Sequence, residues 1–172
     1  MISVEQIPKE DSPLAKVRAV IHDTDRDWLK VLANQLKALG IKAVYEASTP
    51  KEALNFIQDM KIDILITHWD KALITFIRQN KKSPKQKLPI ILLTSGLQQK
   101  MIYEARDIGI DELIAKPASA KMIFDHIEHA LTHRRPFVRV ATYIGPDRRR
   151  HQKEKLSGPD RRKVQNQEDP ET

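Results

Sequence analysis

Four polar side chains that could bind a phosphate or a metal ion each stand at the end of a short apolar run. They are the carboxylate of Asp23, the imidazole of His68, the hydroxyl of Thr94 and the ammonium of Lys116. Carboxylate oxygens are ligands that Mg²⁺ prefers, while ammonium and hydroxyl groups bind phosphoryl oxygens. Brought together, these groups would resemble a phosphoryl-transfer site in which a histidine stands among the acidic residues.

The elements that would position these side chains are five buried strands, each followed by a helix. Runs of apolar and β-branched residues predict the strands, and apolar residues at helical spacing predict the helices. The strands are expected at 17–22, 42–47, 63–67, 89–94 and 111–115, and the helices at 26–40, 49–60, 72–82, 97–109 and 119–133. This alternation requires right-handed crossovers, and so predicts a three-layer α/β domain with a parallel sheet over 17–133.

In a parallel sheet the carboxyl ends of the strands share one edge, where α/β proteins bind their ligands. The first strand ends in "HDTD", the third in "THWD", the fourth in "TSG" and the fifth in "AKP". We therefore expect the four polar groups to lie near one another at this edge.

Five segments in this order resemble the receiver domain of bacterial two-component response regulators. They are "VIHDTD", "LKALG", "DILITHW", "LPIILLTSG" and "GIDELIAKP", and the resemblance extends over essentially all of 17–133. The resemblance implies a flavodoxin-like (βα)5 fold with strand order 2-1-3-4-5. It also implies that Lys116, which precedes Pro117, matches the lysine that contacts the phosphoryl group, that Thr94 matches the switch hydroxyl, and that Asp23 matches the first of the paired acidic residues.

Other positions depart from the family pattern. Thr24 stands where the second, metal-binding acidic residue is expected, and His68 stands at the phosphoacceptor aspartate. Leu113 replaces the usual aromatic residue, and the "MPxxDG" loop after the third strand is missing. An acyl phosphate needs a carboxylate nucleophile, and transfer needs Mg²⁺ held by carboxylates. We therefore expect a pseudo-receiver that is not an enzyme, has lost the Mg²⁺ site and needs no cofactor.

Several roles remain open for the site residues. His68 is expected to fill the acceptor pocket, hydrogen-bonded to Asp23 and away from Lys116; a phosphohistidine or a proton-sensing switch is the alternative. Lys116 either pairs with Asp23 or binds an anion. Asp70 should point away from the site, although Asp23, Asp25 or Asp70 could serve as a non-standard phosphoacceptor.

Three histidines lie on the last predicted helix. His129 and His133 have the i, i+4 spacing of zinc-binding helices, and His126 is close to both on a helical projection. The chain has no cysteine, and no second group of ligands accompanies these histidines in the sequence. We interpret them as a solvated flank of the helix and predict no metal site.

The positive charge of the chain is concentrated in its C-terminal segment. Residues 1–132 contain 19 Lys/Arg and 17 Asp/Glu, whereas residues 133–163 contain 11 and 3. This segment repeats "GPDRRR" and "GPDRRK", in which a turn precedes an arginine cluster. The arginines expected to bind an anion are Arg148, Arg149, Arg150, Arg161 and Arg162.

The basic segment could bind a cyclic dinucleotide, nucleic acid phosphates or an anionic membrane surface. It resembles the arginine-rich tails of some stand-alone alphaproteobacterial receivers, a few of which resemble cyclic di-GMP effectors. No groove-reading helix is apparent, so specific nucleic acid binding is not expected. We expect residues 134–172 to be disordered in isolation, and residues 1–15 to form a disordered extension.

The sequence shows neither a secretory signal nor an apolar run of membrane-spanning length, so a cytoplasmic protein is expected. We expect an adaptor that acts without phosphorylation, through a protein partner or a second copy bound at the fourth helix, fifth strand and fifth helix. The alternative is an effector that binds cyclic di-GMP through its tail.

Overall fold

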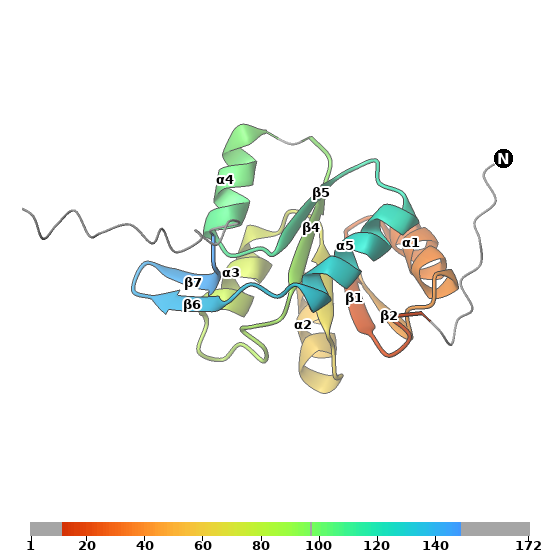
Figure 1. Cartoon of the computed structure of the whole chain (residues 1–172), viewed down its shortest axis with the longest axis horizontal. Helices are drawn as coiled ribbons and strands as arrows, with labels where there is room; N and C mark the ends of the chain where they lie inside the picture. The colour runs from red at the N-terminus through yellow and green to blue at the C-terminus, as the bar shows by residue number, and fades with distance from the viewer. Residues whose placement is uncertain (1–11, 97, 149–172) are drawn as a thin grey trace, which may run out of the picture.

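The computed structural model describes residues 12–96 and 98–148, which form five βα units followed by a β-hairpin (Figure 1). The strands are β1 (Arg18–His22), β2 (Ala43–Ala47), β3 (Ile64–Thr67), β4 (Ile90–Thr94), β5 (Glu112–Ala115), β6 (Phe137–Val140) and β7 (Tyr143–Pro146). The helices are α1 (Arg26–Ala38), α2 (Pro50–Asp59), α3 (Lys71–Gln79), α4 (Gln99–Asp107) and α5 (Ala120–Thr132).

The five-stranded sheet confirms the predicted topology. Its strand order is β2-β1-β3-β4-β5, and each neighbouring pair is parallel. The register places His22 beside Thr67 and Thr94 beside Ala115. The residues that follow β1, β3, β4 and β5 therefore emerge at the same edge of the sheet.

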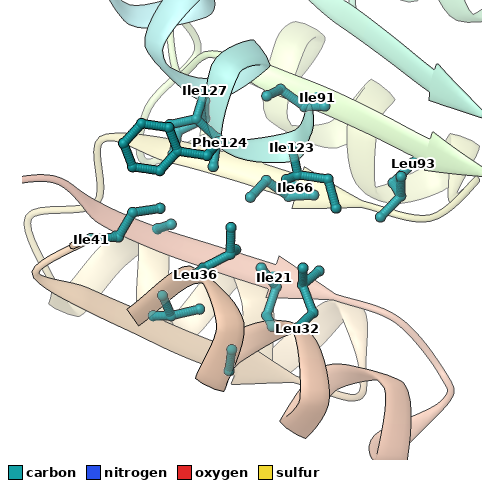
Figure 2. Close-up of a cluster of buried hydrophobic side chains, with 14 of the residues drawn as sticks. Ile21, Leu32, Leu36, Ile41, Ile66, Ile91, Leu93, Ile123, Phe124 and Ile127 are labelled. Atoms are coloured by element: carbon teal, nitrogen blue, oxygen red, sulfur yellow. The ribbon is translucent and has the colours of Figure 1, made fainter. Parts of the chain in front are cut away.

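Two apolar layers hold the helices against the sheet. On one face, α1 and α5 pack over Ile21, Ile66 and Ile91, and Leu36 and Phe124 reach into this layer from the two helices (Figure 2). On the other face, α2, α3 and α4 cover alternate residues of the same strands. Because successive side chains of a strand point to opposite faces, strands covered on both faces must be apolar throughout.

Side chains at the carboxyl edge also start the helices. Asp25 accepts hydrogen bonds from the amides of Asp27 and Trp28 at the start of α1. Thr49 accepts one from the amide of Glu52 at the start of α2, and Asp70 caps α3 in the same way. Such caps satisfy amides that have no partner within the helix.

The end of the predicted N-terminal extension is ordered. Residues 13–16 form a turn, and Leu14 is only 2% exposed in the layer beneath α1. The amide of Ala15 donates to the carbonyl of Ser12 over 2.9 Å. The expectation of disorder was therefore wrong for residues 12–15, because one leucine packs against the domain within an otherwise polar segment. Residues 1–11 lie outside the described residues.

The predicted tail begins with an ordered β-hairpin. Strands β6 and β7 pair antiparallel around a two-residue loop, and the guanidinium of Arg135 fastens the hairpin to the domain. It donates to the carbonyls of Ile110 and Asp111 over 3.1 and 2.7 Å, and to that of Asp147 over 2.9 Å. A short hairpin is marginal in isolation, so docking supplies its stability. Residues 134–148, which belong to the segment expected to be disordered in isolation, are thus ordered where they dock on the domain, and residues 149–172 lie outside the described part of the chain.

In the described parts of the chain, no helix is long and apolar enough to cross a membrane.

Candidate functional site

The carboxyl edge of the sheet gathers the residues singled out in the sequence. Asp23 follows β1, His68 follows β3, Thr94 ends β4 and Lys116 follows β5. The backbone amide of His68 donates to the carbonyl of His22 over 2.9 Å, which ties the ends of β1 and β3 together.

Lys116 and Asp23 form a tight ion pair across this edge. Lys116 Nζ lies 2.6 Å from Asp23 Oδ2, and the ammonium also lies 4.7 Å from the ring centroid of Trp28 on α1. The other carboxylate oxygen, Oδ1, accepts a hydrogen bond of 3.1 Å from the amide of Asp25. Both oxygens of Asp23 are therefore engaged by the protein itself.

The electrostatics of Asp23 favour its ionised form. Burial alone would raise the pKa of this carboxyl, but the hydrogen bond from Lys116, the amide of Asp25 and the charge on Lys116 hold the pKa below its ordinary value. A carboxylate in this setting neutralises the lysine.

His68 takes a partner other than the expected Asp23. Its Nδ1 lies 3.4 Å from the carbonyl oxygen of His22, and its ring packs on the ring of His22 with centroids 4.7 Å apart and planes tilted by 34°. Lys116 takes the place at Asp23 that His68 was expected to fill. The prediction that His68 is hydrogen-bonded to Asp23 was therefore wrong: the ring of His68 packs on the ring of His22.

His22 is a site residue that the sequence analysis missed. Its side chain is 2% exposed, and its Nδ1 lies 2.9 Å from Thr67 Oγ1. Burial and then the nearby His68 lower the pKa of His22, so its ring is neutral at neutral pH. A polar residue at the last position of an otherwise apolar strand was the signal available in the sequence.

Asp70 also belongs to this cluster. One oxygen of Asp70 and one ring nitrogen each of His22 and His68 all lie within 4.8 Å of one another. The expectation that Asp70 points away was wrong, because capping α3 turns its carboxylate back toward the sheet edge. Its Oδ1 accepts a hydrogen bond of 2.9 Å from the amide of Leu73.

The two threonines of the predicted site differ in their surroundings. Thr24 is exposed. The hydroxyl of Thr94 donates toward the carbonyl of Ser95 over 3.4 Å and lies 3.7 Å from Met101 Sδ on α4. Thr94 therefore links the end of β4 to α4.

A magnesium ion fits this edge poorly. Asp23 is occupied by Lys116, and threonine and histidine stand where two further carboxylates would be needed. Mg²⁺ demands near-octahedral oxygen ligands and is held in proteins chiefly by carboxylates. The cavity beside His22, His68 and Asp23 measures only about 10 Å³, which leaves no room for the several water ligands that Mg²⁺ usually keeps.

Two histidines of α5 share one acidic partner, and His133 at the end of the helix stacks on one of them. His126 Nδ1 and His129 Nδ1 lie 3.6 and 3.2 Å from the two carboxylate oxygens of Glu112 on β5, and the ring of His133 stacks on His129 with centroids 4.8 Å apart. They line an open groove of about 540 Å³ beside Arg135. The histidines thus form a polar flank, joined to the edge strand by Glu112.

Arg148 is the only one of the predicted tail arginines among the described residues. Its guanidinium lies 3.9 Å from the ring centroid of Tyr143 and 3.2 Å from Asp107 Oδ1. Arg149, Arg150, Arg161 and Arg162 lie outside the described residues.

Comparisons with known proteins agree with this fold. The family model of the response regulator receiver domain matches residues 19–128. The chain is 25% identical over 116 residues to the chemotaxis protein CheY of Pseudomonas aeruginosa, covering 65% of this chain and 94% of that protein. It is 32% identical over 90 residues to the response regulator protein VraR of Staphylococcus aureus, covering 51% of this chain and 43% of VraR.

Solved structures show the same architecture. The chemotaxis response regulator CheY4 of Vibrio cholerae matches with a TM-score of 0.60 at 18% identity, covering 67% of this chain and 98% of that one. A response regulator from Desulfuromonas acetoxidans matches with a TM-score of 0.60 at 21% identity, covering 68% and 98%. With its fold, its strand order and the match over 19–128, the chain belongs to the response regulator receiver domain family.

Proposed function

We propose that this chain is a pseudo-receiver, which acts in the cytoplasm as a phosphorylation-independent signalling adaptor and not as an enzyme. The observation that supports this most directly is the 2.6 Å ion pair between Lys116 Nζ and Asp23 Oδ2, beside an imidazole at the acceptor position. The lysine that would bind a phosphoryl group is neutralised by the carboxylate that would bind a metal ion.

The chemistry of aspartyl phosphorylation is not available to these groups. An acyl phosphate requires a carboxylate nucleophile, and His68 provides an imidazole. In-line transfer also requires Mg²⁺ to offset developing negative charge, and the carboxylates for that ion are missing at positions 24 and 68. We therefore propose that the Mg²⁺ site has been lost.

The alternative phosphoacceptors are engaged in structural roles. Asp23 binds Lys116, Asp25 caps α1 and Asp70 caps α3. These contacts favour the adaptor over a receiver that uses a non-standard aspartate.

Incubation with radiolabelled acetyl phosphate and Mg²⁺ tests this proposal. We expect no stable label on the wild-type chain or on His68→Ala. The double variant Thr24→Asp/His68→Asp should gain an alkali-labile label, because it restores both carboxylates beside Lys116 and Thr94. Label on the wild type that His68→Ala abolishes would indicate a phosphohistidine and would overturn the proposal, as would label that Asp23→Asn, Asp25→Asn or Asp70→Asn abolishes.

The surface formed by α4, β5 and α5 is the proposed docking face for a protein partner or a second copy. Ile102 and Tyr103 on α4 are 41% and 48% exposed, and Met122 on α5 is 46% exposed. Exposed apolar side chains on neighbouring elements are typical of protein interaction sites.

An effector that binds cyclic di-GMP is the second candidate, favoured by a cluster of guanidinium groups. Arg106, Arg135 and Arg148 line one groove of about 430 Å³ between α4 and β5, at the point where the basic segment leaves the domain. Guanidinium groups bind phosphates bidentately and stack on bases, and cyclic di-GMP offers both. Asp111 and Glu112 also line the groove, so Arg149, Arg150, Arg161 and Arg162 would have to add to its positive charge.

Calorimetry distinguishes the second candidate from the first. If the effector role is correct, titration of cyclic di-GMP into the full chain should release heat with about 1:1 stoichiometry. A variant with alanine at arginines 148–150 and 161–162 should then bind at least about tenfold more weakly, because each charge-assisted contact contributes about 1.5–3 kcal/mol. Absence of heat with the wild-type chain would eliminate this candidate and leave the adaptor.

A further inference from the structure

We propose that His22, His68 and Asp70 form a binding site for a divalent transition metal ion, of which Zn²⁺ is the best fit. One ring nitrogen of each histidine and one oxygen of Asp70 lie within 4.8 Å of one another. Tetrahedral coordination at about 2.0–2.1 Å from Zn²⁺ places ligand atoms about 3.3 Å apart. Side-chain rotations that bring these atoms together by up to about 1.5 Å would complete the site.

The hydrogen bonds of His22 leave one ring nitrogen free to bind a metal. The hydroxyl of Thr67 donates to the carbonyl of His68 over 2.9 Å, so its oxygen accepts from Nδ1–H of His22. This tautomer leaves a lone pair on His22 Nε2. That atom is buried without a hydrogen-bond partner among the described residues.

The unpartnered Nε2 atom of His22 indicates a binding site for a ligand. A buried nitrogen without a hydrogen bond destabilises the folded state, so such atoms in native proteins usually bind a water, an ion or another group. Metal-bound histidines commonly donate their second N–H to a neighbouring oxygen, which fixes the ring. Thr67 holds His22 in this way, with Nε2 as the metal-binding atom.

Asp70 can bind a metal ion without giving up its structural role. Its Oδ1 accepts the hydrogen bond from the amide of Leu73 that caps α3, which leaves Oδ2 available. His68 and Asp70 are both half-buried, so an ion held by them and by His22 would keep a coordination position open toward solvent.

The ligand types select against Mg²⁺ and in favour of transition metals. Imidazole nitrogens suit Zn²⁺, Cu²⁺, Ni²⁺ and Fe²⁺, whereas Mg²⁺ prefers oxygen ligands. Of the three residues, only His68 was matched to a position of the family's phosphorylation site in the sequence. The proposed site therefore shares His68 with the expected phosphoacceptor position and takes its other two ligands from His22 and Asp70. It does not depend on the adaptor role.

Metal titration of the full, EDTA-stripped chain tests the site. We expect one equivalent of Zn²⁺ by calorimetry, and Co²⁺ should give the intense visible bands of a four- or five-coordinate ion. His68→Gln and Asp70→Asn should each lower Zn²⁺ affinity at least about tenfold, since loss of even a supporting contact costs 10–100-fold. Asparagine can still cap α3, so Asp70→Asn keeps the fold.

A matched control excludes binding to the surface histidines. The variant His126→Gln/His129→Gln should retain the full affinity, and Mg²⁺ in large excess should not compete. A long-range ¹H–¹⁵N spectrum should show the Nε2 resonance of His22 shifting on addition of Zn²⁺. The proposal is overturned if the wild type binds no Zn²⁺, if His68→Gln and Asp70→Asn bind as tightly as the wild type, or if the control variant alone loses binding.

Discussion

Replacing Arg78 with methionine is expected to lower the free energy of unfolding by about 3–5 kcal/mol, the usual cost of removing one partner from a buried ion pair. Arg78 lies on α3 and is 1% exposed. Methionine would fill much of the same space, so the loss would come from the polar groups left behind and not from a cavity.

Arg78 satisfies four acceptors at the edge of the sheet opposite the candidate site. Its Nε donates to the carbonyl of Gly109 over 2.7 Å, and its Nη1 donates to the carbonyls of Gln86 and Leu88 over 2.8 and 2.7 Å. Its Nη2 lies 3.0 Å from Asp111 Oδ2. One side chain therefore joins α3, the loop before β4 and the start of β5.

Burial disfavours the charged forms of both Arg78 and Asp111. Burial lowers the pKa of Arg78 and raises the pKa of Asp111, while the attraction between the two opposes both shifts. Asp111 Oδ2 also accepts a hydrogen bond of 2.8 Å from the amide of Ile90. Without Arg78, the carboxylate of Asp111 would keep only the amide of Ile90 as a donor, and the carbonyls of Gly109, Gln86 and Leu88 would each lose the donor that Arg78 supplies.

Urea denaturation measures this effect. Asp111→Asn keeps an acceptor for the amide of Ile90 and should lose only about 1.5–3 kcal/mol. Arg106→Met removes an arginine whose partner Asp107 is also exposed, and should change stability by no more than about 0.5 kcal/mol. A loss below about 1 kcal/mol in Arg78→Met would mean that the buried network contributes little to the fold.

Gly109→Ala should be the second severe substitution, with a loss of about 2–4 kcal/mol from backbone strain and displacement of the hairpin. Gly109 has φ of +92°, a conformation that side chains disfavour. A Cβ there would lie 3.0 Å from the carbonyl oxygen of Ile144 and 3.2 Å from the Cα of Gly145, both in β7. Backbone atoms cannot rotate out of the way, so the docked hairpin would have to move.

Gly96→Ala is the matched control for Gly109→Ala. Gly96 has φ of +77°, but a Cβ there would meet nothing within 4 Å. It should therefore lose only the strain, about 1–2 kcal/mol. Limited trypsin digestion supplies a second measurement, because cleavage after Arg139 in the hairpin should accelerate in Gly109→Ala and not in Gly96→Ala. Equal losses and equal cleavage rates would show that the hairpin is not seated against Gly109.

The order of the βα units could be predicted because each strand and helix has a local signal in the sequence. A strand that is covered on both faces, such as Ile90–Thr94, is apolar up to its last residue, and caps such as Thr49 stand directly before their helices. The hairpin and Arg78 gave no such signal. The hairpin strands are short and partly polar, and Arg78 looks like an ordinary exposed residue of an amphipathic helix until its acceptors are in place.

The sequence by itself determined the fold, the edge of the sheet where the site lies, and the replacement of the acceptor carboxylate by His68. The pairing of Lys116 with Asp23 was one of two roles that the sequence left open, and the structure confirms it; only the tertiary structure decided that His22 lies against His68 and Asp70. The sequence does not show these contacts because most of the partners are far apart in the chain, and neighbouring residues of a strand point to opposite faces. Their contacts depend on strand register and on the turn into α3, which local periodicity does not encode.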